Sequence, residues 1–115
     1  MPDIRAAVEQ FLLRCGFSPS LAGFNALRVA IEVVSKEPNR LRNIHKLVYP
    51  LVAHETGYKG STTRQYMYRS FYSFLDHADL DKVQQELGYA PPASKGVYTL
   101  KEFLAAAAIV VRKEG

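Results

Sequence analysis

The chain has 115 residues, of which 48% are hydrophobic, and a formal net charge of +4. This length suits one domain with its own apolar core, and the composition excludes an intrinsically disordered chain. No apolar run approaches the roughly 20 residues of a membrane span, no secretory signal opens the chain, and a single cysteine excludes an internal disulfide framework. We therefore expect one cytoplasmic domain over residues 1–115, with Cys15 as a small buried hydrophobe.

Apolar residues at helical spacing predict the first two helices. The first runs from about residue 2 to 15 and ends at Gly16. Its apolar face consists of Ile4, Val8, Phe11 and Cys15. The second begins at Ser18-Pro19, because serine is a good N-cap and proline suits the first helical position, and it ends at residues 37–39. Its stripe consists of Phe24, Leu27, Ile31 and Val34.

The next part of the chain is predicted to form two short helices. The first covers residues 40–48, with an inward face of Leu41, Ile44 and Val48. Pro50 cannot continue that helix without a kink but can begin another, so a short helix is predicted over 50–56. Its buried residues are Leu51 and Val52. Two glycines in four residues then predict a turn over 57–60.

A longer helix is predicted to begin near Thr62 and to end at about His77. Thr62 and Gln65 have the spacing of a capping box, in which the two residues satisfy backbone N–H groups of the first turn. One side should face the core and consists of Met67, Phe71, Phe74 and Ala78, flanked by Tyr68 and Leu75. The opposite side should face solvent and consists of Thr63, Tyr66, Ser70 and Ser73, with Arg69 on its edge.

Two further helices are predicted in the last third of the chain. Asp79 is an N-cap for a short helix that ends at Gly88. A loop with two consecutive prolines follows over residues 89–98. The last helix then extends to about Lys113.

The start of the last helix has two local signals. Thr99 and Glu102 form a capping box, and Tyr98 and Phe103 have the spacing of a hydrophobic staple. Four consecutive alanines over 105–108 predict close packing, either within this chain or against another copy. Because no segment alternates with period two, the predicted fold class is all-α, a compact bundle of about six helices.

Basic side chains concentrate in one third of the chain. Residues 38–75 contain six of them against one acid, Glu55, whereas the remainder has a net charge of −1. The six are Arg40, Arg42, Lys46, Lys59, Arg64 and Arg69. Clustered cations are typical of a protein that binds a polyanion, and a solvated surface is the alternative interpretation.

Residues 49–73 have the layout of a helix-turn-helix, which consists here of a short helix, a glycine-bearing turn and a longer helix. In such a unit the second helix inserts its N-terminal turns into the major groove. No carboxylate lies between Tyr58 and Leu75, although the helix dipole favours acids at a helix N-terminus. This absence favours the approach of phosphate. A solvated amphipathic helix in an ordinary bundle is the competing interpretation.

Signals of catalysis are poor. His54-Glu55 lacks the second histidine of a zinc-protease motif. Residues 57–61 contain the glycine, lysine and serine of a phosphate-binding loop, but in the wrong order. His45 and His77 have no cysteine or acidic companions at ligand spacing. We therefore predict that the protein is not an enzyme and uses no metal, cofactor or small-molecule substrate.

Three blocks in the same order resemble one known family. They are the run 16–31 with Gly23-Phe24-Asn25-Ala26-Leu27-Arg28, the run Ile44-His45-Lys46-Leu47-Val48-Tyr49-Pro50, and Leu87-Gly88-Tyr89 followed by a proline-bearing loop and residues 99–103. Together they resemble the C-terminal DNA-binding (effector) domain of the sporulation stage-zero response regulator, the master transcription factor of sporulation initiation. The likeness covers about residues 15–113.

This resemblance implies a six-helix fold and sequence-specific, sporulation-related transcriptional regulation through double-stranded DNA. It also implies tandem binding to short repeated boxes, with neighbouring domains in contact through their last helices. Its base-reading positions on the helix at about 62–77 correspond to Ser61, Thr62, Thr63, Gln65, Tyr66 and Arg69. The cations predicted to contact phosphate are Lys59, Arg64, Arg40, Arg42 and Lys46.

The chain also differs from the family pattern. Its turn is one residue longer, and it has Thr63, Gln65 and Tyr66 where the family has arginine and glutamate. No receiver domain is expected, because the effector-like sequence occupies the chain from near its start. The alternative function is therefore that of a receiver-less relative that acts as a protein-interaction module or antagonist and does not read bases. Such a protein would use its tyrosine-rich helix as an interface.

Overall fold

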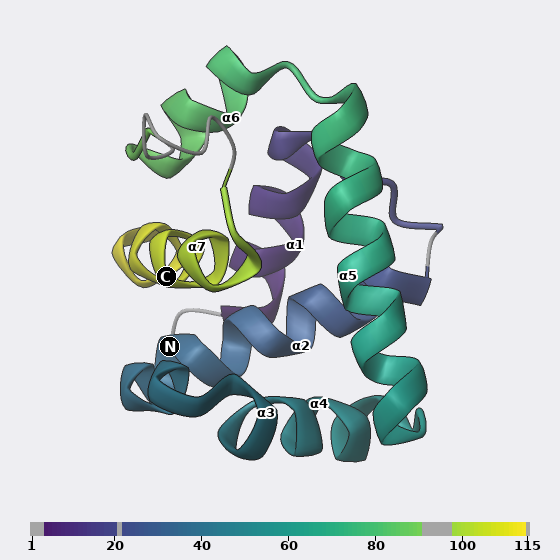
Figure 1. The fold of residues 1–115 in the computed structure, drawn as a ribbon. Helices are drawn as coiled ribbons and strands as arrows, with labels where there is room; N and C mark the ends of the chain where they lie inside the picture. The colour runs from purple at the N-terminus through teal and green to yellow at the C-terminus, as the bar shows by residue number, and fades with distance from the viewer. Residues whose placement is uncertain (1–3, 21, 91–97, 115) are drawn as a thin grey trace.

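The computed structural model describes residues 4–20, 22–90 and 98–114. Within these ranges the chain forms seven α-helices and one 3₁₀-helix and no strand, which confirms the predicted all-α class (Figure 1). The elements in chain order are α1 (Ile4–Cys15), α2 (Ala22–Lys36), η1 (Pro38–Asn43), α3 (Ile44–Leu47), α4 (Tyr49–Thr56), α5 (Gly60–His77), α6 (Leu80–Leu87) and α7 (Leu100–Glu114).

Helix α2 lies at the centre of the bundle and packs against α1, α4, α5 and α7 (Figure 1). The predicted stripe explains this position, because its four side chains are all buried, namely Phe24, Leu27, Ile31 and Val34. Val29 and Ala30 are buried as well, so apolar side chains cover more than one side of the helix. A helix that is apolar over most of its circumference must be surrounded by others.

Helix α7 packs against α1 and α2, and most of its row of alanines is buried. Residues 106–108 are buried, and residue 105 is half-buried. The small side chains therefore allow close packing within this chain, which answers the question that the sequence left open. Cys15 is also buried, as predicted, and burial raises the pKa of its thiol to about 12.

The predicted helix caps at the last two helices are confirmed. Asp79 Oδ1 accepts hydrogen bonds from the backbone N–H groups of Asp81 and Lys82, at 3.1 and 3.3 Å. Thr99 N donates to Glu102 Oε1 at 2.9 Å, and Glu102 N donates to Thr99 Oγ1 at 3.1 Å, which is the reciprocal capping box. The loop predicted over 89–98 lies mostly outside the described residues.

The predicted starts of two helices are wrong. Helix α2 begins at Ala22, and the Oγ atom of Ser18 contacts Ser20 Oγ at 2.9 Å instead of capping a helix. Helix α5 begins at Gly60, so Thr62 lies inside its first turn and forms no capping box with Gln65. The predicted helix over 40–48 is also divided, into the 3₁₀-helix η1 and the single turn α3.

Candidate nucleic-acid interface

Helices α4 and α5 form the predicted helix-turn-helix, and both pack on α2. Helix α4 ends at Gly57, whose φ of +77° is a left-handed conformation that glycine adopts without strain. Thr56 fixes the turn that follows, because its Oγ1 donates to Val52 O at 2.7 Å and accepts from Tyr58 N at 3.3 Å. The turn therefore holds the start of α5 at a defined place beside α4.

Thr63 does not face solvent, so its predicted role in base reading is wrong. Its side chain is fully buried, and Oγ1 donates to the carbonyl oxygen of Lys59 at 3.0 Å. Residues four apart share one side of a helix, and Thr63 lies in line with the buried Met67 and Phe71. The backbone N–H of Thr63 bonds to the same carbonyl at 2.8 Å, which starts the helix before Thr62.

Ser70 was also predicted to face solvent, but it packs against α2. A β-carbon built on Gly23 would lie 1.6 Å from Ser70 Oγ, so the two helices are in direct contact at this point. Ser73, one turn further on, is exposed as predicted. The inner side of α5 is therefore broader than its apolar residues alone indicate.

The remaining predicted base-reading residues form one outer face at the N-terminal half of α5. Ser61, Gln65 and Arg69 are exposed, while Thr62 and Tyr66 are half-buried. Tyr58 supports Tyr66 from the turn, with the two rings perpendicular and their centroids 5.2 Å apart. The side chains of Gln65 and Arg69 form no hydrogen bond or ion pair with any described residue. Their polar groups are thus free to bind a partner.

Four of the five predicted phosphate contacts are exposed, namely Arg42, Lys46, Lys59 and Arg64. Arg40 is different, because its Nη1 donates to Leu47 O at 3.1 Å and its Nε lies 2.9 Å from Glu37 Oε2. The N–H group at Nε does not point at this oxygen closely enough to form a hydrogen bond. The guanidinium therefore connects η1 to the end of α3. Contrary to the prediction, Arg40 binds groups within the fold and is not free to contact phosphate.

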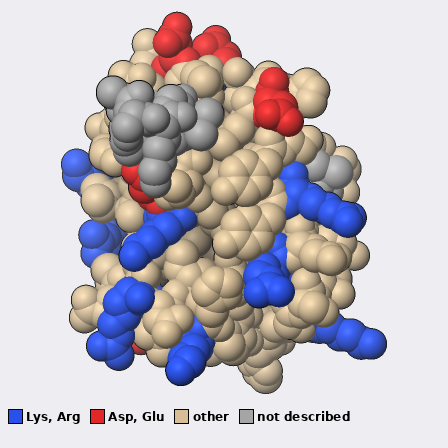
Figure 2. Space-filling model, viewed as in Figure 1, with Lys and Arg blue, Asp and Glu red and all other residues tan. Residues whose placement is uncertain are grey.

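Three arginines of the interface differ from three arginines elsewhere in whether they form an ion pair. Outside the interface, Arg5, Arg14 and Arg28 each pair with a carboxylate. Arg42, Arg64 and Arg69 form no ion pair with any residue that the structure describes. Figure 2 shows lysine and arginine side chains around η1 and α3 and along α5, and others on the side of α7, while most of the visible acids lie near α6. The three unpaired arginines of η1 and α5 thus belong to the basic part of the chain, residues 38–75.

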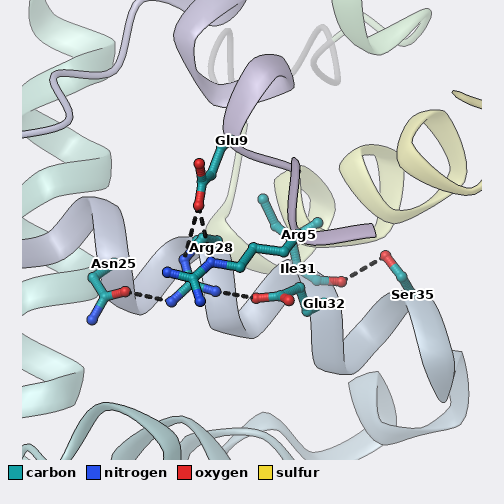
Figure 3. A network of polar contacts seen from close by, with 7 residues as sticks. All are labelled: Arg5, Glu9, Asn25, Arg28, Ile31, Glu32 and Ser35. Atoms are coloured by element: carbon teal, nitrogen blue, oxygen red, sulfur yellow. Dashed lines mark hydrogen bonds and ion pairs between the residues drawn. The ribbon is translucent and has the colours of Figure 1, made fainter. Parts of the chain in front are cut away.

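The contrast with the paired group is clearest at Arg28, between α1 and α2 (Figure 3). Its guanidinium donates to Glu32 Oε2 at 2.5 Å and to Asn25 Oδ1 at 2.6 Å, and it lies 3.9 Å from Glu9 Oε1. Burial raises the pKa of Glu32, and the Arg28 charge opposes that rise. This network fixes α2, the helix on which α4 and α5 rest.

A hollow of about 450 Å³ lies where the first turns of α4 and α5 approach each other. It is lined by His45, Tyr49, Pro50, Gly60, Ser61 and Arg64. His45 meets the Tyr49 ring edge-on, with centroids 5.2 Å apart, and burial raises the pKa of the Tyr49 phenol. His45 and Tyr49 are not among the residues predicted for the interface, because each helix considered alone gives no sign that two N-termini meet.

The sequence model of the family described as sporulation initiation factor Spo0A C terminal matches residues 8–111. The chain belongs to this family. A comparison with curated proteins finds no significant match. The family consists of DNA-binding domains of sporulation transcription regulators and is not an enzyme family, which confirms the resemblance stated above.

Two further searches concern the described residues alone. In these ranges no group of three or more His, Cys, Asp or Glu side chains is placed to hold a metal ion. No helix there has both the length and the apolar character that crossing a membrane requires.

Proposed function

We propose that this domain reads double-stranded DNA in a sequence-specific manner, with the N-terminal half of α5 in the major groove. Ser61, Thr62, Gln65, Tyr66 and Arg69 lie at the base edges in this arrangement. The observation that carries the proposal is the outer face of α5, where Gln65 and Arg69 are exposed without internal partners. Side-chain amides and guanidinium groups are the groups that read adenine and guanine in the major groove.

The free cations near that face supply the contacts to phosphate. Lys59 and Arg64 lie at the start of α5, and Arg42 and Lys46 lie on η1 and α3. Phosphate contacts from separate elements fix the register of the recognition helix, and base contacts then select the sequence. Each neutralised phosphate steepens the fall of log affinity with log salt concentration by about 0.9.

The experiment is a selection of bound duplexes from a random pool, followed by titration of the enriched duplex with two variants. Arg69→Ala removes a proposed base contact, and Arg112→Ala is a matched control, because Arg112 is an exposed arginine of α7. We expect Arg69→Ala to weaken binding to a single enriched site by roughly 5- to 150-fold. Equal affinities of the two variants would contradict the proposal.

A second candidate function is a protein-interaction module or antagonist without base reading. The observation that favours it is the parallel stack of Tyr68 and Tyr72, whose centroids are 6.0 Å apart. Tyr72 is 46% exposed, and exposed tyrosines are common in protein interfaces. Salt separates the two functions, because DNA affinity falls by orders of magnitude between 50 and 200 mM salt, whereas an aromatic interface loses little.

Self-association through the last helix on tandem sites is part of the proposal. The alanines of α7 are largely used within the chain, so the available surface is the exposed Ile109 and the half-buried Val110. Both line a groove of about 410 Å³ between α6 and α7. The test compares Ile109→Lys with the unmodified protein on duplexes that hold one or two enriched sites. We expect weaker binding on two sites and unchanged binding on one, and equal two-site binding would exclude this surface.

A further inference from the structure

We propose that Gln65 and Arg69 read an adenine and a guanine that are separated by at most one intervening base pair. This inference rests on the proposed function and extends it, because it assigns a base to each residue and a spacing to the pair. It follows from three features of α5, namely the geometry of positions four apart, the chemistry of the two side chains, and the charge of their neighbours.

The geometry sets the spacing. Gln65 and Arg69 lie four residues apart on one α-helix, both are exposed, and their β-carbons therefore project from the same side. Four residues advance a helix by about 6 Å, and neighbouring base pairs in DNA are about 3.4 Å apart. Because any tilt of the helix from the DNA axis shortens this advance, the two side chains meet bases no more than about two steps apart.

The chemistry assigns the bases. A glutamine amide both donates and accepts, which matches the N6 donor and N7 acceptor of adenine. A guanidinium group only donates, and its fork matches the two acceptors O6 and N7 of guanine. Neither Gln65 nor Arg69 loses an internal partner when it binds, because neither has one among the described residues.

The neighbours support the same assignment. No acidic residue occurs between Tyr58 and Leu75, so this part of α5 offers no carboxylate to accept from the N4 amino group of cytosine. A cytosine in the target must therefore be recognised through its paired guanine. Thr63 was predicted to belong to this face, but its side chain is buried. Among long side chains that can form bidentate contacts, the face thus offers Gln65 and Arg69.

The test combines side-chain and base changes on the duplex enriched from the random pool. In that duplex, 7-deaza-adenine or 7-deazaguanine replaces each purine in turn, which removes N7 and leaves base pairing intact. Affinities are measured for the unmodified protein, Gln65→Ala and Arg69→Ala, with Arg112→Ala as the control. Because Gln65 and Arg69 are exposed and without partners, neither substitution should disturb the fold, and circular dichroism verifies this.

We expect one adenine position to couple with Gln65 and one guanine position to couple with Arg69. At each of these two positions, removal of N7 weakens binding of the unmodified protein several-fold. The same removal has little further effect on the matching variant, because that variant has already lost the contact. The two positions are adjacent or separated by one base pair. Coupling at a wider spacing, exchange of the two bases, or additive effects at every purine would overturn the inference.

Failure of this inference and failure of the proposed function give different results. If a motif is enriched but no purine couples with Gln65 or Arg69, DNA reading stands and the assignment is wrong. If the unmodified protein binds all duplexes equally or binds none, the assignment and sequence-specific reading are both wrong.

Discussion

Gly23 of α2 lies directly beneath Ser70 of α5. A β-carbon at residue 23 would come within 2.4 Å of the Ser70 β-carbon and within 2.6 Å of the backbone oxygen of Tyr66. Contacts this short do not occur between real atoms, so no residue with a side chain fits at position 23 without movement of α5. The absence of a side chain at one residue of α2 thus sets the position of α5.

Replacement of Gly23 by alanine should therefore displace α5 and weaken both folding and DNA binding. Overpacking of this kind lowers the free energy of unfolding by about 1–3 kcal/mol. The measurement is thermal unfolding followed by circular dichroism, together with affinity for the enriched duplex. Gly60→Ala is the matched control, because a β-carbon there meets nothing within 4 Å. If both variants unfold at the same temperature, the contact does not position α5.

Removal of the Arg28 guanidinium should destabilise the fold through Glu32. The two side chains are only 12% and 17% exposed, so Arg28→Ala leaves a largely buried carboxylate without its partner. We expect a loss of about 2–4 kcal/mol at neutral pH, measured by denaturant unfolding. A double variant, Arg28→Met with Glu32→Leu, should lose less than Arg28→Ala, because it leaves no unpaired charge.

The same variant should show a characteristic pH dependence. Burial already raises the pKa of Glu32 in the folded state, and loss of the Arg28 charge raises it further. A raised carboxyl pKa means that the folded state binds its proton more tightly than the unfolded state. The stability of Arg28→Ala should thus be greater at pH 4.5 than at pH 7.5, relative to the unmodified protein. A constant difference across this range would show that Glu32 is not responsible.

The thiol of Cys15 should be unreactive until the protein unfolds. Burial raises its pKa to about 12, so almost no thiolate exists at pH 8.5, where a free cysteine is half ionised. Labelling with a disulfide reagent at pH 8.5 should be slow in buffer and fast in denaturant. The raised pKa also means that stability falls as pH rises from about 8.5 toward 12. Rapid labelling of the native protein would contradict the burial of this thiol.

Arg64 and Arg40 should respond differently to substitution by alanine. Arg64 is exposed and unpaired within the described residues, so its loss should reduce the salt dependence of DNA affinity by about 0.9 in slope. Arg40 holds η1 to the end of α3, so its loss should lower the unfolding temperature and leave the slope unchanged. Titrations at several salt concentrations and thermal unfolding separate the two effects.

Much of this fold was predictable from short stretches of sequence. The capping box of Thr99 and Glu102, the cap at Asp79 and the stripe of α2 follow from local sequence patterns, and the structure confirms all three. Each depends on residues within one or two helical turns, where backbone geometry fixes which groups meet. The location of the helix-turn-helix and of the basic residues around it was predictable for the same reason.

The tertiary structure decided which polar residues of α5 remain outside. Thr63 and Ser70 have the chemistry of surface residues, yet one is buried and the other packs on Gly23, a residue 47 positions away. The start of α5 and the occupation of Arg40 were likewise missed. Burial of a polar side chain depends on the neighbours that other helices bring to it, because a hydroxyl or guanidinium can be satisfied by a nearby carbonyl as well as by water. Local sequence sets the direction of a side chain on its helix, and the packing of distant helices determines whether that direction faces solvent or protein.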